Sequence, residues 1–358
     1  MARERIRGRR NAFRPAHRLK ADVGDDMGEA VSSVNKAAWK PRVIQATRDP
    51  RSVHVAILLS LYNGEAFLNR QLDSFIEQTH GDWTLYWRDD GSTDSSRAIM
   101  LSFQANRGAG RCVEIDVGSG ERVGVMDSYV RLLEAAPAGG VIAFADQDDV
   151  WLPEKVARGV DGLSRASDDA PRLYCARQIL TDRALKEIAL SPVIPQPFGV
   201  LTALAQNIAT GCTVMMNDRA RRLLTEMQPA PPFIMHDWWA YLVVTAAGGT
   251  VEIDQSPVIL YRQHGQNAVG APSSWRRRAC AAIRRGPGAF MDIFRSNLSY
   301  LLEHRKFLDP HVVAILAAVQ NGLGSGKLTR WRLLRRFPHL TRASLSERVL
   351  FRLWFVIG

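Results

Sequence analysis

The chain has 358 residues, of which 46% are hydrophobic and 23% are charged, and it contains 27 glycines and 17 prolines. This composition excludes a fibrous or disordered protein and suffices for one large globular domain, alone or with a smaller appendage. The four cysteines are far apart in the sequence and form no CxxC pair or zinc-type cluster. That pattern indicates reduced thiols in a cytosolic protein.

The formal net charge of +11 is concentrated at the two ends of the chain. Residues 1–20 contain eight Lys/Arg and one acidic residue, and residues 276–358 contain sixteen Lys/Arg and four acidic residues. The segment between them is therefore acidic, and the ends are the candidates for contact with an anionic surface. Residues 1–50 are polar, basic and aperiodic, so we expect a disordered or loosely attached segment. We expect neither a secretory signal nor a membrane-spanning helix, because no apolar run is long enough.

Strand and helix patterns alternate from residue 53 onward. Short apolar runs predict strands over 54–62, 83–89, 112–117 and 141–146. Helical periodicity predicts helices over 65–78, 95–104 and 125–136, each between two of these strands. This alternation favours a parallel sheet with helices on both faces, and ligands of such sheets bind at the carboxyl ends of the strands.

The second half of the chain is more mixed. Shorter strands are expected over 212–217, 250–254 and 258–264, and residues after about 275 look helical and basic. We therefore predict three parts: a basic segment (1–50), a catalytic α/β domain (51–275) and a helical, basic extension (276–358).

Acidic clusters follow two of the predicted strands. In DDGSTD (89–94), Asp89 and Asp90 come directly after the second strand, although a capped turn explains this motif equally well. In DQDDVWLPEK (146–155), Asp146, Asp148 and Asp149 place three carboxylates within four residues. Such crowding raises carboxyl pKa values unless a cation offsets the charge, and Mg²⁺ or Mn²⁺ suits oxygen ligands and a diphosphate. The proline at 153 is expected to start a helix.

Two further motifs contain side chains suited to catalysis. HDWW begins at His236 and YRQHG ends at Gly265. Asp237 could act as a general base, and His264 could complete a metal shell as neutral imidazole. A helix-capping aspartate and a hydrogen-bonded loop histidine are the structural alternatives.

These motifs in this order resemble the inverting family 2 glycosyltransferases with the GT-A fold. The resemblance rests on YNGE (62–65), DDGSTD, DQDDVWLPEK, HDWW and YRQHGQN (261–267), and it covers about residues 53–275. The last motifs are most similar to bacterial members described as rhamnosyltransferases. The fold implied is a Rossmann-like α/β fold with a mixed, mostly parallel sheet flanked by helices.

The resemblance also implies a role for individual residues. For donor binding, Leu61, Tyr62 and Asn63 would line the nucleoside pocket with Asp89 and Asp90, and Asp146 would lie near the ribose. For catalysis, Asp148 and His264 would bind the metal or diphosphate, and Asp237 would be the catalytic base. On the acceptor side the matching positions are Gly211, Cys212, His236 and Trp238, with His236 standing where many members have glutamate.

The implied reaction is the inverting transfer of one sugar from a nucleoside diphosphate donor. The resemblance implies rhamnose from a dTDP-linked donor, and a UDP-linked donor is the alternative. The carboxylate would take the proton of the acceptor hydroxyl, and Mg²⁺ or Mn²⁺ would offset the charge on the departing diphosphate. The acceptor would be a lipid-linked or surface glycan. The basic C-terminal helices would contact an anionic membrane, placing the protein at the cytoplasmic face of the plasma membrane. Packing of these helices on the catalytic body is the alternative.

Other classes of protein fit less well. GSGERVG (118–124) lacks the G-x-G-x-x-G spacing of a dinucleotide-binding loop, and GLGSGKL (322–328) lacks two residues that a phosphate-binding loop requires. The basic ends and the pI near 9.9 would suit a nucleic-acid-binding protein. The alternative to an enzyme is therefore a nucleic-acid- or membrane-binding protein whose sugar-nucleotide-binding domain is catalytically inactive. A processive synthase would carry a Q-x-x-R-W motif, but Gln263 is followed by HGQ. We therefore expect an enzyme and no nucleic-acid partner.

Overall fold

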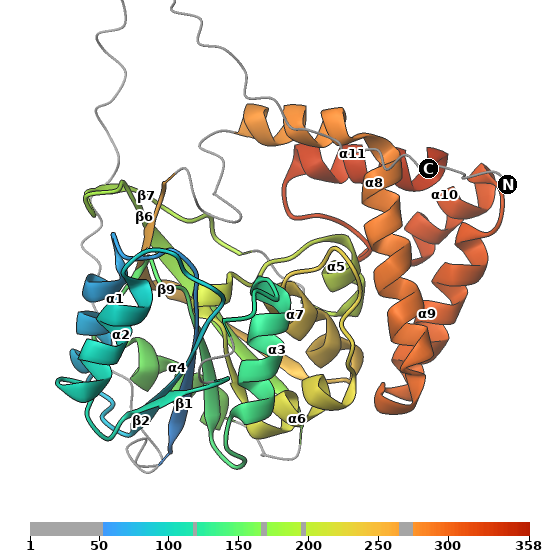
Figure 1. Cartoon of the computed structure of the whole chain (residues 1–358). Coiled ribbons are helices and arrows are strands. Elements are labelled where there is room, and N and C mark those ends of the chain that lie inside the picture. Colours follow the sequence, from blue (N-terminus) through green and yellow to red (C-terminus); the bar gives the residue numbers. More distant parts are fainter. Residues whose placement is uncertain (1–52, 117–119, 166–169, 195–197, 265–274) are drawn as a thin grey trace, which may run out of the picture. The chain divides into compact units, whose positions relative to one another are not determined.

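The structure is a computed structural model, and it describes residues 53–116, 120–165, 170–194, 198–264 and 275–358. The predicted basic segment 1–50 lies outside these residues, as do the end of the YRQHGQN motif and the predicted boundary near residue 275. Within the described part, an α/β region is followed by a group of helices (Figure 1).

The first half of the α/β region follows the predicted alternation of strands and helices. Its elements are β1 (Val55–Leu61), α1 (Leu68–Ile76), β2 (Trp83–Asp89), α2 (Ser96–Ala105), β3 (Cys112–Glu114), α3 (Val125–Ala135) and β4 (Val141–Ala145). The third strand is shorter than expected. It ends at Glu114, and Asp116 has a φ of 59°, a left-handed conformation that extended strands do not contain.

The sheet has the strand order β3-β2-β1-β4-β8-β6-β9-β5, and β7 pairs with β6. The first four strands are parallel, as expected from their helical crossovers. In the register of β1, Leu61 lies beside Asp89 of β2, and Leu59 lies beside Ala145 of β4. The residues that follow these three strands therefore meet at one edge of the sheet.

Strand β1 is buried on both faces, which explains why its sequence is an unbroken apolar run. Ile57 and Leu59 belong to a core shared with α1, α2 and α4, whereas Ala56 and Leu58 belong to a core shared with α3, α6 and α7. Since successive side chains of a strand point to opposite faces, the two sets define three layers, with helices on both sides of the sheet (Figure 1).

The second half of the α/β region contains the elements expected after Pro153, over 212–217 and over 250–264, together with others that the sequence did not indicate. They are β5 (Val150–Trp151), α4 (Lys155–Ser164), β6 (Arg172–Thr181), β7 (Glu187–Leu190), α5 (Val200–Ala205), the 3₁₀ turn η2 (Gly211–Thr213), β8 (Met215–Asn217), α6 (Asp218–Glu226), α7 (His236–Ala246) and β9 (Thr250–Arg262). The strand predicted over 212–217 begins only at Met215, because the preceding residues form η2. The helix expected at Pro153 begins two residues later, at Lys155.

The strands predicted over 250–254 and 258–264 are one strand, β9. It pairs in parallel with β6, and the register shifts near Pro257. Proline has no N–H to donate to the ladder, so strands accept it at irregular positions such as this one. The side chain of Asp254 accepts a hydrogen bond from Ser256 N (2.9 Å), which stabilises the bend.

The C-terminal helices are α8 (Trp275–Glu303), α9 (Pro310–Leu323), α10 (Lys327–Arg336) and α11 (Leu345–Ile357), with a 3₁₀ turn, η3 (Arg305–Phe307), after α8. Their inward side chains belong to the same core as α5 and α7. Trp239 of α7 donates a hydrogen bond to the hydroxyl of Tyr300 in α8 (2.8 Å). No helix in the described part of the chain is long and apolar enough to cross a membrane.

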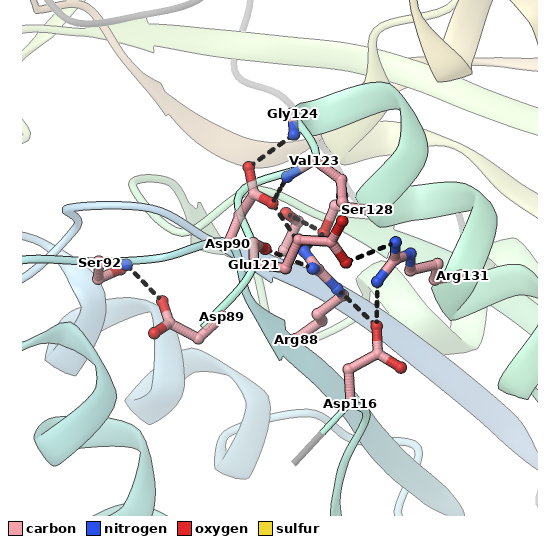
Figure 2. A network of polar contacts seen from close by, with 11 residues as sticks. Arg88, Asp89, Asp90, Ser92, Asp116, Glu121, Val123, Gly124, Ser128 and Arg131 are labelled. Carbon is pink, nitrogen blue, oxygen red and sulfur yellow. Dashed lines mark hydrogen bonds and ion pairs between the residues drawn. The ribbon is translucent and has the colours of Figure 1, made fainter. Parts of the chain in front are cut away.

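A buried arginine joins β2 to the residues that precede α3 (Figure 2). The Arg88 side chain is inaccessible to solvent and forms ion pairs with Asp90 (2.7 Å) and Asp116 (2.9 Å). Its third contact is a hydrogen bond to the backbone oxygen of Glu121 (2.7 Å). An arginine guanidinium can satisfy several acceptors at once, so this one side chain holds residues from three segments together.

We predict that Arg88→Met will lower the free energy of unfolding by about 3–5 kcal/mol, because it leaves the buried Asp90 carboxylate without its cation. Urea denaturation measures this change. Arg131→Met is the matched control: Arg131 also pairs with Asp116 (2.9 Å) but is 33% exposed, so its loss should cost less than about 1 kcal/mol. Equal effects of the two substitutions would contradict the role given to Arg88.

Candidate active site

The edge at which β1, β2 and β4 end carries the residues predicted to bind the nucleotide. Two hydrogen bonds join Tyr62 to Gln147. Tyr62 N donates to Gln147 Oε1 (2.9 Å), and Gln147 Nε2 donates to Tyr62 O (2.8 Å). Asn63 N donates to Ser92 Oγ (3.0 Å), and Asn63 Oδ1 accepts from Thr93 N (2.8 Å). The segments after the three strands are therefore bonded to one another. Gln147 was not among the predicted residues, and its place between the aspartates was the available signal.

Asp89 and Asp90 are adjacent in sequence but differ in their surroundings (Figure 2). Asp89 is partly exposed, and its carboxylate accepts one hydrogen bond, from Ser92 N (3.1 Å). Asp90 is buried, and besides the Arg88 pair it accepts hydrogen bonds from Val123 N (2.7 Å) and Gly124 N (2.9 Å). The Asp90 carboxylate is occupied by protein donors and holds the loop before α3, and its expected contact with the nucleotide stays a prediction.

The loop held by Asp90 also reaches the predicted nucleoside pocket. The guanidinium of Arg122 lies 4.1 Å from the centre of the Tyr62 ring. Gly91 has a φ of 81° and lies close to this loop, because a Cβ built on it would be 3.4 Å from Gly120 O and 3.5 Å from Arg122 Cβ. Sequence reasoning considered this glycine-rich segment only as a dinucleotide-binding loop and missed Arg122.

The three aspartates after β4 have different partners. Asp148 Oδ2 lies 2.8 Å from His264 Nε2, at the end of β9, and both side chains are largely buried. Asp146 Oδ1 lies 3.2 Å from the hydroxyl of Tyr129, a residue of α3. Asp149 is fully buried and accepts a hydrogen bond from Arg262 N (3.1 Å). The structure thus brings Asp148 and His264 together although 115 residues separate them in the sequence.

The electrostatics of this region suit a bound cation. Burial, Asp148 and Asp237 raise the pKa of Asp146 to about 7. Burial and the charges of Asp148 and Asp146 also raise the pKa of Asp149. A divalent cation would offset this repulsion, and carboxylate oxygens match the preferences of Mg²⁺ and Mn²⁺.

Two groups of side chains could hold that cation. One is the Asp148–His264 pair; the other is Asp146, Asp149 and Cys212, whose ligand atoms lie within 4.8 Å of one another. Burial raises the pKa of the Cys212 thiol well above its usual range, which keeps it protonated and a poor ligand. Burial lowers the pKa of the neighbouring Lys155 to about 7, although Cys212, Asp149 and Asp146 act in the opposite direction, so this amine interacts with the same carboxylates as a cation would. The Asp148–His264 pair fits the ion better.

Asp237 lies in the first turn of α7, facing η2. Its Oδ2 accepts a hydrogen bond from Gly211 N (3.0 Å), and its Oδ1 accepts one from Trp238 N (2.6 Å). Burial raises its pKa to about 6, while these hydrogen bonds and one from Asn207 act in the opposite direction. The carboxylate is thus fixed in orientation, ionised at neutral pH and more basic than an exposed aspartate. Its charge acts on Asp146, so it lies near the aspartates that follow β4.

Two of the residues predicted on the acceptor side are buried beneath the surface. His236 is 4% exposed; its ring stacks on Tyr129 (3.8 Å between centroids) and meets the edge of Phe144 (4.8 Å). Burial lowers its pKa to about 3, so the imidazole is neutral. Cys212 is 0% exposed. Segments distant in sequence bury both side chains, so the acceptor-side role of these two positions stays a prediction.

The other two acceptor-side residues have positions closer to Asp237. A Cβ on Gly211 would lie 2.9 Å from His236 Nε2, so only glycine fits there while its N–H donates to Asp237. Trp238 is partly exposed, and its indole N–H donates to Ala203 O (2.7 Å), which fixes the ring beside α5.

Comparison with known proteins agrees with this geometry. Residues 56–187 match the model of Glycosyl transferase family 2. The chain is 26% identical over 233 residues to the dTDP-rhamnosyl transferase RfbG of Shigella flexneri, covering 62% of this chain and 76% of that protein. It is also 26% identical over 165 residues to the UDP-Glc:alpha-D-GlcNAc-diphosphoundecaprenol beta-1,3-glucosyltransferase WfgD of Escherichia coli, covering 46% of this chain and 60% of that one.

A solved structure with a similar fold is that of S. aureus TarS residues 1–349 in complex with UDP-GlcNAc. The TM-score is 0.51 and the identity 14%, over 80% of this chain and 78% of that one. This likeness concerns the fold, and it agrees with the mostly parallel sheet and its flanking helices. The strand-end carboxylates, the sheet order and the sequence match lead to one conclusion: residues 56–187 match Glycosyl transferase family 2, and the chain is a glycosyltransferase with the GT-A fold.

Proposed function

We propose that this glycosyltransferase is cation-dependent and inverting, and that it moves one sugar from a dTDP- or UDP-linked donor to a hydroxyl of a lipid-linked or surface glycan. The observation that carries the proposal is the position of Asp237, a partly buried and oriented carboxylate whose charge acts on Asp146. A dTDP-rhamnose donor is supported by the name of the relative RfbG, and a UDP-linked donor by that of WfgD. The latter name also supports a lipid-linked acceptor.

In the proposed reaction the donor nucleotide binds at the ends of β1 and β2. Tyr62 offers its ring to the base, and Asp89 has carboxylate capacity left for the imide N–H of uracil or thymine. Asp146 lies where the ribose would bind, and Asp148 with His264 would hold Mg²⁺ or Mn²⁺ at the diphosphate. The ion supplies a positive charge that stabilises the leaving diphosphate.

Asp237 takes the proton of the acceptor hydroxyl as the hydroxyl oxygen attacks the anomeric carbon. The bond from that carbon to the donor's diphosphate oxygen breaks in the same step, so the configuration inverts. Because the pKa of Asp237 is raised to about 6, it is a better proton acceptor than an ordinary aspartate and still ionised at pH 7. The buried, neutral His236 adds no positive charge that would weaken this base.

Asp237→Asn should lower kcat by about 10²–10⁴-fold while leaving the dissociation constant of the donor nearly unchanged, because the amide keeps the shape but cannot take a proton. Transfer assays and calorimetric titration with UDP and dTDP measure the two quantities. Asp218→Asn is the matched control, an aspartate in the first turn of the neighbouring helix α6. Near wild-type turnover in Asp237→Asn would refute the assignment of the base.

The pH dependence should follow the ionisation of Asp237. Only the deprotonated carboxylate accepts the acceptor proton, so kcat/KM should rise with pH and level off above a midpoint near 6. A pH–rate profile of the wild-type enzyme measures this midpoint. The residual activity of Asp237→Asn should not show this rise with pH. If the rise persists in that variant, another group is responsible for it.

Asp148→Ala and His264→Ala should each weaken Mn²⁺-dependent donor binding by at least about tenfold, because each removes one candidate ligand. Titration of UDP with and without Mn²⁺, and with a chelator, measures the effect. Cys212→Ala distinguishes the two candidate groups and should leave the metal dependence intact. If Cys212→Ala weakens Mn²⁺-dependent binding and the other two substitutions do not, the ion binds at the Asp146–Asp149–Cys212 group instead.

We also propose that the enzyme works at the cytoplasmic face of the plasma membrane, held there by its C-terminal helices. A lipid-linked acceptor requires the enzyme to approach a bilayer, and the basic character of residues 276–358 supports this location.

A further inference from the structure

The helices α10 and α11 are apolar on two opposite sides. On the inner side, Leu333, Phe351 and Phe355 are buried in the core that continues into the catalytic region. On the outer side of α11 an exposed stripe consists of Leu345, Val349, Leu353 and Ile357. These four residues are spaced by four, so they lie along one side of the helix. Packing within the protein accounts for the inner side and leaves the outer stripe unexplained.

A groove separates α10 from α11 next to this stripe. Its volume is about 540 Å³, and its lining includes Trp331, Leu334, Leu353, Val356, Arg335 and Arg352. The guanidinium of Arg335 lies 4.9 Å from the centre of the Trp331 ring, which places a cation beside the exposed indole. The groove thus offers apolar walls and two positive charges together.

The charge of this surface is almost entirely positive. α10 carries Lys327 and four arginines and no acidic residue, and α11 carries two arginines and Glu347. Glu347 is itself 4.0 Å from Arg342. Among the described residues, Arg335 and Arg352 have no carboxylate partner. These two guanidinium groups are therefore available to phosphates in solution or on a surface.

We infer that α10 and α11 form a docking surface for an anionic phospholipid bilayer. The α11 stripe enters the interface between headgroups and acyl chains, and Arg335 and Arg352 bind headgroup phosphates beside the groove. α11 has 13 residues, so it is about 20 Å long and can lie along the interface. This inference specifies the surface behind the membrane location in the proposed function and rests on it for its purpose, but not on the sugar or the reaction.

Other occupants match only part of this surface. A nucleic acid would satisfy the arginines but would leave the aliphatic stripe in water. A second copy of the chain would cover the stripe but would bring two strongly positive surfaces together, which costs free energy. An anionic bilayer satisfies both features, since it presents phosphates above hydrocarbon.

The test measures co-sedimentation of the full chain with vesicles of phosphatidylcholine alone or with 30% phosphatidylglycerol. We expect binding to the anionic vesicles, at least about tenfold weaker binding to the neutral ones, and weakening as salt is raised. Arg335→Gln with Arg352→Gln should lower the partition coefficient about 10- to 30-fold, since each basic residue near the surface contributes about tenfold or less. Val349→Ser with Leu353→Ser should lower it about tenfold or more by removing buried methyl groups.

Two matched controls keep the result specific to this surface. Ile188→Ser with Leu190→Ser, on β7, changes side chains that are 62% and 52% exposed, compared with 63% and 52% for Val349 and Leu353. Arg219→Gln with Arg222→Gln removes two exposed charges from α6 instead. Both control proteins should bind vesicles like the wild type.

Donor hydrolysis and transfer to a soluble acceptor should be unchanged in all four variants, which separates a failure of docking from a failure of the proposed function. Equal binding to both vesicle types, or wild-type binding by the stripe variant, would overturn the inference. So would a vesicle-free dimer that Val349→Ser with Leu353→Ser dissociates, because a second copy would then cover the stripe. Tighter binding to RNA than to vesicles, lost with the two arginines, would overturn it in favour of a nucleic acid.

Discussion

The parallel pairing of β1 with β2 and β4 is the constraint on which the rest of the site depends. Because Leu61 pairs with Asp89 and Leu59 with Ala145, the chain leaves all three strands at the same edge of the sheet. Hydrogen bonds from Tyr62 N to Gln147 Oε1 and from Asn63 N to Ser92 Oγ then join the segments that follow the three strands. A shift of one residue in any of these strands would turn its side chains toward the opposite helical layers and would separate these contacts.

The site contains more negative charge than its surroundings balance, and the structure handles that charge in two ways. At the end of β2, Arg88 lies inside the protein and neutralises Asp90, which is a structural role. At the other end, Asp146, Asp148 and Asp149 crowd together, and burial and neighbouring charges raise the pKa values of Asp146 and Asp149. Unbalanced charge of this kind is stable when a cation or substrate binds, so the second end is suited to function and the first to architecture.

The C-terminal helices serve the catalytic region on one side and are free on the other. Their inner side chains extend the core of α7, the helix that carries Asp237, and the Trp239–Tyr300 hydrogen bond ties α7 to α8. The two interpretations of the basic helices, packing on the body and contact with a membrane, are therefore compatible. Packing holds the inner faces, which leaves the outer face of α10 and α11 as the proposed membrane surface.

The sequence by itself determined the alternation of strands and helices in the first half, the acidic residues at the strand ends and the resemblance to the family. These features are local, since period-two and period-3.6 patterns and strand-end turns depend on neighbouring residues. Only the tertiary structure decided that Asp90 faces Arg88, that His236 and Cys212 are buried, and that Asp148 meets His264. It also joined two predicted strands into β9 and revealed the exposed stripe of α11. Burial and contact between distant segments depend on register and packing across the whole sheet, and no local pattern specifies them.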